Sequence, residues 1–202
     1  MSPPLPHINY DQMTDEELVK NSLKSEDAFY SLMKRYEPVL IRYIHRMTQV
    51  NREEAEDLLQ EIFIKVYLNL NGFDTNLKFS TWVYRITHNE IISQYRKKGQ
   101  IRFSIELDAG SEEARSIAGF LVDTLNVETD FLDREKAKAV RTALEKLPSK
   151  YRDILVMYYF EELNYREISD ILQKPPGSVA TLLNRAKDKF KKIAERYQLE
   201  SK

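Results

Sequence analysis

The chain has 202 residues, of which 42% are hydrophobic and 31% charged, and its formal net charge is −1. This composition fits one large or two small folded domains and excludes wholesale disorder, and 5 glycines and 7 prolines favour long helices over a turn-rich β fold. The absence of cysteine excludes disulfides, thiolate metal sites and a cysteine nucleophile. No apolar run is long enough to span a membrane and no signal peptide is visible, so we expect a cytoplasmic protein without membrane insertion.

The charges are distributed unevenly along the chain. Basic residues gather near 96–102 and 185–196, whereas acidic residues gather near 11–17, 53–61 and 106–135. Local basic patches suit DNA, and acidic stretches suit a basic protein partner. Because phosphate neutralisation dominates DNA affinity, we expect this nearly neutral chain to bind DNA weakly on its own.

The first half of the chain predicts a series of helices. Thr14 followed by Glu17 is a capping box that opens the first one. Apolar residues continue at helical spacing through Pro38, which predicts either a kink or a helix start there. Asn51 is expected to cap the next helix, and Gly72 is expected to end it in a left-handed conformation.

That next helix contains EAEDLLQEIFIKVY and has an acidic outer face. Glu53, Asp57 and Glu61 follow one another at a spacing of four, which would allow them to ligate a divalent metal. A helical carboxylate site would also need Glu-x-x-His pairs on partner helices, and none of the three histidines stands in that pattern. A solvated face and an acidic docking surface for a basic protein are the other two interpretations.

The segment FSTWVYRITHNEIISQYRKK at 79–98 interleaves aromatic, hydroxyl, amide and basic side chains on one predicted helix. We expect Ser80 or Thr81 to lie near its N-terminal cap. Stacking faces beside phosphate-seeking charges suit single-stranded or melted nucleic acid. The alternative is an ordinary amphipathic helix with a buried Trp82 and a solvated basic end.

Apolar anchors become sparse after this helix, in an acidic and turn-prone stretch. A loop of that length would be unusual inside one compact domain, so we interpret it as a linker. Helical patterning resumes after Phe131, stops at Pro148 and returns in a helix from Lys150 to Phe160. The predicted fold is all-α, with two small helical domains joined by a mostly irregular acidic linker. In chain order, the N-terminal tail, first domain, linker and second domain are 1–13, 14–98, 99–130 and 131–202.

The second domain ends in a predicted helix-turn-helix. Its first helix has an apolar inner face made of Tyr165, Ile168, Ile171 and Leu172. Lys174-Pro175-Pro176-Gly177 then forces a tight connection, with Pro176 in the first turn of the second helix. The outer face of that helix carries short polar groups followed by basic ones: Ser178, Ala180, Thr181, Asn184, Arg185 and Lys187. A recognition helix in the major groove has this arrangement, and a surface αα-hairpin with a solvated polar face is the alternative.

Three motifs together resemble a known family. They are DLLQEIF at 57–63, FSTWVYRITHN at 79–89, and LPSKYRDILVMYYFEELNYREISDIL at 147–172 with the PPGSVATLLNRAK run after it. Over most of 25–195 the chain resembles an extracytoplasmic-function (ECF) sigma factor of the sigma-70 superfamily. The resemblance implies a stress-response transcription initiation factor with no enzymatic activity and no cofactor. Its implied partners are core RNA polymerase (the clamp coiled coil and the flap), promoter DNA and an anti-sigma factor.

The resemblance also implies roles for individual residues. The expected contacts to core polymerase are Asp57, Gln60 and Glu61. The loop at 71–78 is expected to hold a flipped base, and the other −10 contacts are Lys78, Phe79, Thr81, Trp82, Arg85, Asn89 and Arg96. The expected −35 contacts are Arg166, Ser178, Ala180, Thr181, Asn184, Arg185 and Lys187. Ala180 stands where the family often has a basic residue, which leaves the −35 sequence preference open.

Two other functions remain open from sequence. A conventional helix-turn-helix regulator would bind duplex DNA without polymerase, but it leaves the Trp82 segment and the acidic helix without a role. A metal-dependent hydrolase would use Glu53, Asp57 and Glu61, but no nucleophile–base pair or phosphate-cradling glycine loop accompanies them.

The expected linker limits how far apart the two domains can lie. Promoter elements about two duplex turns apart are roughly 70 Å from each other, whereas a free coil of about 30 residues spans only ~30 Å. We therefore expect a compact free chain in which the domains cover each other's DNA surfaces until polymerase holds them apart.

Overall fold

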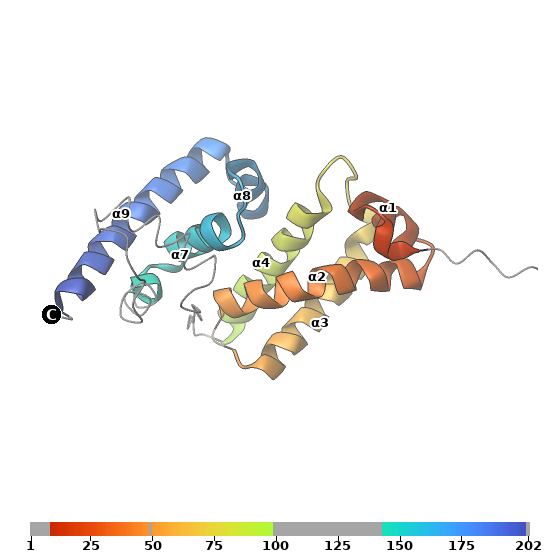
Figure 1. Ribbon diagram of the computed structural model, residues 1–202, viewed down its shortest axis with the longest axis horizontal. Helices are drawn as coiled ribbons and strands as arrows, with labels where there is room; N and C mark the ends of the chain where they lie inside the picture. The colour runs from red at the N-terminus through yellow and green to blue at the C-terminus, as the bar shows by residue number, and fades with distance from the viewer. Residues whose placement is uncertain (1–8, 49, 99–142, 201–202) are drawn as a thin grey trace, which may run out of the picture.

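The computed structural model describes residues 9–48, 50–98 and 143–200, and all regular elements in these ranges are helical (Figure 1). The predicted all-α class is thereby confirmed. The predicted linker lies outside the described residues, so the boundaries of the two domains stay a prediction. Within the described ranges, the helices are too short or too polar to cross a membrane.

The first half of the chain forms a helical bundle. Its elements are η1 (Tyr10–Gln12), α1 (Asp15–Ser22), α2 (Glu26–Met47), α3 (Arg52–Asn69), η2 (Leu70–Gly72) and α4 (Phe79–Lys98). The predicted capping box opens α1, because the Thr14 hydroxyl accepts from the Glu17 N–H and the Glu17 carboxylate accepts from the Thr14 N–H. Asn51 caps α3 in the same way, with Glu54 as its partner.

The structure differs from three local expectations for this bundle. Helix α2 continues through Pro38, which excludes a helix start there and leaves the kink a prediction. Gly72 does not take a left-handed conformation; the 3₁₀ turn η2 follows α3 directly and uses its terminal carbonyls, which removes the need for such a cap. Helix α4 begins at Phe79, so Ser80 and Thr81 lie inside its first turn and not at the cap.

The second domain is built from the remaining helices. Residues 143–146 are helical and precede α7 (Ser149–Leu155), η3 (Val156–Phe160), α8 (Tyr165–Leu172) and α9 (Pro176–Glu200). Helix α7 and the π-helical segment η3 together form the helix predicted from Lys150 to Phe160. Pro176 begins α9 as expected, and Gln173 ends α8 with a left-handed φ of 52°.

The inner face of α8 differs from the prediction at one position. Ile168 and Ile171 are buried, but Tyr165 is 39% exposed. Tyr165 is the first residue of the helix, and its ring packs against Tyr158 with the centroids 5.6 Å apart. The buried faces of α8 and α9 otherwise follow the predicted periodicity, which fixes the polar face of α9 toward solvent.

The two halves of the molecule contact each other, and α4 packs beside α8 (Figure 1). Helix α8 also packs against α9, so it lies between the last helix of the first domain and the last helix of the chain. This arrangement places the two predicted DNA-binding helices on either side of α8.

Candidate nucleic-acid and polymerase interface

The outer face of α9 presents most of the predicted −35 residues to solvent. Ser178, Thr181, Asn184 and Arg185 are exposed, and Arg166 is exposed at the start of α8. The opposite face of α9 is held in the core by Val179, Leu183, Ala186 and Phe190. Burial of that apolar stripe therefore orients the polar residues outward.

Two predicted −35 residues are less accessible. Ala180 is half-buried, and Lys187 is half-buried with its ammonium over the rings of Tyr158 and Tyr159, at 5.3 and 5.5 Å from their centroids. A cation over two aromatic faces is stabilised electrostatically. Lys187 thus has a structural contact that sequence reasoning did not anticipate.

A concavity of about 490 Å³ opens beside Arg166, lined by Tyr158, Asn164, Tyr165 and Arg166. The Asn164 side chain accepts hydrogen bonds from the N–H groups of Arg166 and Glu167 and so caps α8. Sequence reasoning missed Tyr158 and Asn164, although Asn164 followed three residues later by Glu167 is a capping signal.

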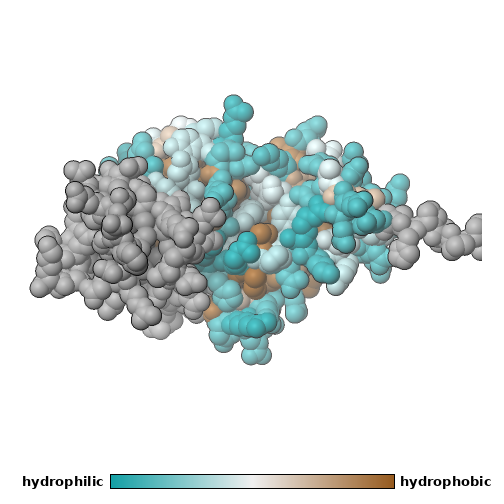
Figure 2. Space-filling model, viewed as in Figure 1, coloured by the Kyte–Doolittle hydropathy of each residue, from teal (hydrophilic) through white to brown (hydrophobic). Residues whose placement is uncertain are grey.

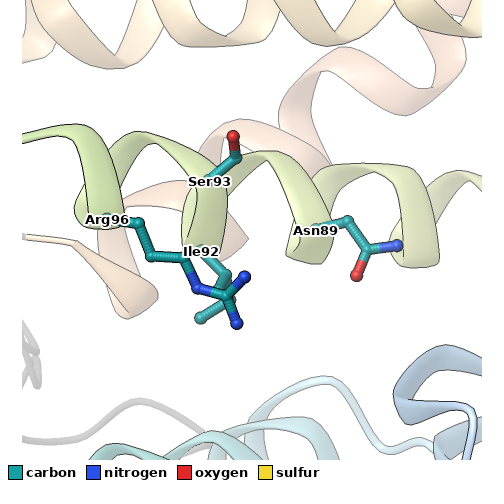
Figure 3. A pocket seen from close by; sticks show the side chains of 4 residues that line it. All are labelled: Asn89, Ile92, Ser93 and Arg96. Carbon is teal, nitrogen blue, oxygen red and sulfur yellow. The ribbon is translucent and has the colours of Figure 1, made fainter.

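Helix α4 presents a second polar surface. Asn89 and Arg96 are exposed and line a concavity of about 480 Å³ together with Ile92 and Ser93. The side chains of Asn89, Ile92 and Arg96 lie on the same side of the helix, toward the C-terminal helices, whereas Ser93 points to the other side (Figure 3). Lys78 is also exposed, and Arg85 is half-buried.

Three of the predicted −10 residues lie in the core. The exposed fractions of Phe79, Thr81 and Trp82 are 1%, 6% and 8%. The indole of Trp82 packs on Phe73 and Phe79, with centroids 5.1 and 5.6 Å away. Their expected base contacts therefore stay a prediction, one that would require this aromatic cluster to become exposed.

The loop before α4 is ordered by its own hydrogen bonds. Asp74 Oδ1 accepts from both the N–H and the side-chain amide of Asn76, each at 2.9 Å. The Leu77 N–H donates to the Asp74 carbonyl at 2.9 Å. Asp–X–Asn turns of this kind fix the backbone locally, so the loop has a defined shape, with Phe73 anchoring it in the core.

The titratable group nearest the middle of α4 is a core residue. Burial lowers the pKa of His88 to about 4, so the imidazole is neutral near pH 7. Its Nδ1 lies 3.1 Å from the hydroxyl of the buried Tyr43. His88 therefore stabilises the packing of α4 on α2 and offers no cation to DNA.

Helix α3 exposes the predicted polymerase contacts Asp57, Gln60 and Glu61. Glu61 also accepts a hydrogen bond of 2.7 Å from Gln94 of α4. The C-terminal half of α3 then exposes apolar side chains that sequence reasoning missed: Ile64, Tyr67 and Leu68, with exposed fractions of 59%, 54% and 70%. The signal for them was available, because these residues fall outside the inner apolar stripe of the helix.

In the coloured part of the space-filling view, hydrophilic groups are widespread and apolar groups lie between them (Figure 2). Among the described residues, no cluster of three or more histidine, aspartate or glutamate side chains is arranged to hold a metal ion. Glu53, Asp57 and Glu61 instead are spread along an exposed helix face, which gives the metal-dependent hydrolase no support from geometry.

Comparisons with known proteins agree with this architecture. Residues 32–101 match the model for Sigma-70 region 2, and residues 137–190 match Sigma-70, region 4. The chain is 34% identical to the ECF RNA polymerase sigma factor SigW of Bacillus subtilis over 182 residues, which are 88% of this chain and 97% of the relative. It is 31% identical to the ECF RNA polymerase sigma-E factor of Escherichia coli K12 over 183 residues, 88% of this chain and 93% of the relative.

Solved structures of other proteins share the fold, two complexes among them. One is CnrH in complex with the cytosolic domain of CnrY, with a TM-score of 0.60 and 19% identity, covering 90% of this chain and 97% of that chain. The other is the sigma factor RpoE in complex with the anti-sigma factor NepR from Bartonella quintana, with a TM-score of 0.56 and 18% identity, covering 80% and 95%. At this identity the likeness concerns the fold alone.

Proposed function

The chain belongs to the ECF RNA polymerase sigma factors of the sigma-70 family, and we propose that it directs core polymerase to promoters by opening the −10 element and reading the −35 element. The observation that carries this proposal is that three exposed surfaces lie on three different helices: α3, α4 and α9. A stand-alone regulator would need only the last of them. The chain performs no catalysis of its own in this proposal.

For the −10 element, we assign the ordered loop at 71–78 to the extruded base, and Asn89 and Arg96 to the adjoining strand. Extruding a base costs a few kcal/mol, and a loop already fixed by Asp74 loses little further entropy when it binds. Trp82 and Phe79 hold the start of this loop in place, because both of their rings pack against Phe73. In the folded arrangement they shape the pocket, and stacking on the DNA would require this buried cluster to become exposed.

For the −35 element, we assign Arg166 and Ser178 to phosphates and the exposed residues of α9 to base edges. Asn184 has the donor and acceptor that adenine requires, and Arg185 suits guanine. Ala180 offers only a methyl group, which fits a thymine methyl. The two-sided polarity of α9 supports this docking.

For the protein partners, we assign the outer face of α3 to core polymerase. Its acidic half suits a basic partner and its apolar half adds buried area, the combination found in specific interfaces. An anti-sigma factor is a further proposed partner, because one of the structures that share this fold is a sigma factor in complex with an anti-sigma factor.

Strand opening in a complex with core polymerase tests this proposal. On a promoter fragment carrying 2-aminopurine in the −10 element, Asn89→Ala combined with Arg96→Ala is expected to reduce the fluorescence rise at least tenfold and to leave core binding unchanged. Lys24→Ala, another exposed cation, is the control. Tight and specific binding of duplex promoter by the chain without polymerase would instead favour the stand-alone regulator.

A further inference from the structure

The contact between the two domains is centred on Glu161, whose side chain is 5% exposed. Its Oε1 accepts from Arg46 Nη1 of α2 at 2.8 Å, and its Oε2 accepts from the Tyr84 hydroxyl of α4 at 2.7 Å. These partners are 115 and 77 positions away in sequence. Both carboxylate oxygens of a residue in the second domain are therefore satisfied by the first domain.

The partners of Glu161 are themselves held in place. Arg46 Nη1 also donates to the Phe160 carbonyl at 3.1 Å, and the guanidinium lies over the Phe160 ring at 5.3 Å from its centroid. Burial, with the Glu161 carboxylate in addition, raises the pKa of Tyr84, so this phenol stays a donor. Separating the domains breaks this ion pair and exposes both charged groups to water. Because the arginine is only 14% exposed, removing one partner by mutation instead leaves the other charge buried without its partner.

A second ion pair lies at the edge of the same contact. Lys78 Nζ is 2.8 Å from Glu167 Oε1, and this hydrogen bond raises the pKa of Lys78. The lysine is 68% exposed, so the pair contributes little to stability. The pair nevertheless engages Lys78, which belongs to the loop that the proposed function assigns to the −10 element.

The closed arrangement is incompatible with reading both promoter elements. Helices α4 and α9 both pack against α8, and packed helices are about 8–10 Å apart, so the axes of α4 and α9 are within roughly 20 Å where they flank it. The promoter elements are roughly 70 Å apart along the duplex. The two helices must separate before they can occupy both elements.

We infer that Glu161 is a latch that holds the free chain closed through Arg46 and Tyr84 and that competes with use of the α4 surface. In the closed form α8 lies against α4, but Asn89 and Arg96 of α4 remain exposed, as do the polar residues of α9. The expected mutual covering of the DNA surfaces is thus only partial: Lys78 is paired with Glu167 across the contact, and the two helices are held too close together to reach both elements. Whether the free chain is closed does not depend on what the protein does, whereas the effect of closure on promoter opening rests on the proposed function.

The distance between the domains measures the latch directly. The chain contains no cysteine, so Lys34→Cys and Asp188→Cys, at two exposed positions, allow specific spin labelling of the full chain. Glu161→Arg places two cations together and is expected to convert one short distance into a long, broad distribution. Adding Arg46→Glu restores an opposite-charge pair and is expected to restore the short distance. Glu162→Arg, an equal charge change at the exposed next residue, is the control.

Binding of a single-stranded −10 oligonucleotide by the free chain is the second measurement. Glu161→Arg is expected to strengthen it about tenfold, within the usual range of coupling between sites, and Glu162→Arg should give the baseline for the added positive charge. A long distance already present in the wild-type chain, or no response to Glu161→Arg, overturns the latch even if the chain initiates transcription with polymerase. A latch that opens in a chain that does not support initiation leaves the latch standing and overturns the proposed function.

Discussion

Trp82 is 8% exposed between Phe73 and Phe79, and Phe79 also meets Tyr36 edge to face at 5.2 Å. These contacts connect α4 to α2 and to the loop that precedes α4. The indole therefore stabilises the first domain, and in the proposed function the promoter contacts at this site are made by the exposed side chains around it.

This placement makes a prediction about stability. Trp82→Ala is expected to lower the free energy of unfolding by about 3–5 kcal/mol, because it leaves a cavity in an aromatic core. Denaturant unfolding followed by circular dichroism measures the change. Asn89→Ala, on the exposed side of the same helix, should change stability by less than about 0.5 kcal/mol. A Trp82→Ala protein of unchanged stability that fails only in promoter opening would show instead that the indole contacts DNA.

A second prediction concerns Asp153, which is 6% exposed. Burial raises its pKa from 3.8 to about 7, against the opposing effect of Arg152. Between those pH values the folded chain binds more protons than the unfolded chain, so this group makes stability fall as pH rises. Asp153→Asn should therefore gain stability relative to wild type between pH 4 and pH 8, by about 1–4 kcal/mol.

Urea unfolding at pH 4, 6 and 8 measures this difference. Asp170→Asn, at an exposed position of α8, is the matched control and should follow the wild-type curve. Parallel curves for wild type and Asp153→Asn would show that the buried carboxyl does not titrate in this range.

The residue-level predictions that succeeded depend on neighbours in sequence. The caps at Thr14 and Asn51 need only a partner three residues away. The burial of Trp82 depends on Phe73 and on α2, which the spacing within α4 does not specify. For this reason the sequence did not decide whether Trp82 is a core residue or a surface residue, and only the packing in the structure decides it.

At the scale of elements, α3 exposes the predicted polar contacts Asp57, Gln60 and Glu61 in one half and apolar side chains in the other. The polar half of this outer face was predicted, and the apolar half was not. Helical periodicity identifies the residues that face the core, but it does not show which outward-facing apolar residues serve a partner. Helix α2 is continuous through Pro38, which the local sequence around the proline did not distinguish from a helix start.

The outer face of α3 gives a prediction about core polymerase. Asp57→Lys reverses a charge in the acidic half of the proposed docking surface and should weaken core binding about tenfold or more, since it opposes a basic partner. Fluorescence anisotropy of the labelled chain with purified core polymerase measures the affinity. Glu37→Lys, an equal change at an exposed position of α2, should have little effect. Equal losses in both variants would mean that only net charge matters.

At the scale of the whole molecule, the two domains close on each other. A compact free chain was expected from the reach of a coil, but the pairing of Glu161 with Arg46 was not, because the two residues are 115 positions apart and each looks like an ordinary surface charge in sequence. The limited covering of the DNA surfaces was also unexpected, since it depends on which face of α8 meets α4. The family motifs predicted the parts of the molecule, and only the fold shows how the parts are held together.

The most direct test of the central claim is transcription by purified core polymerase on a library of fragments from the genome that encodes this chain. With the chain present, the mapped 5′ ends of the transcripts are expected to gather at a new set of start sites that share upstream elements about two duplex turns apart. Core polymerase alone should not use these sites. An unchanged set of start sites, obtained with a folded chain in excess over core polymerase, would contradict the account.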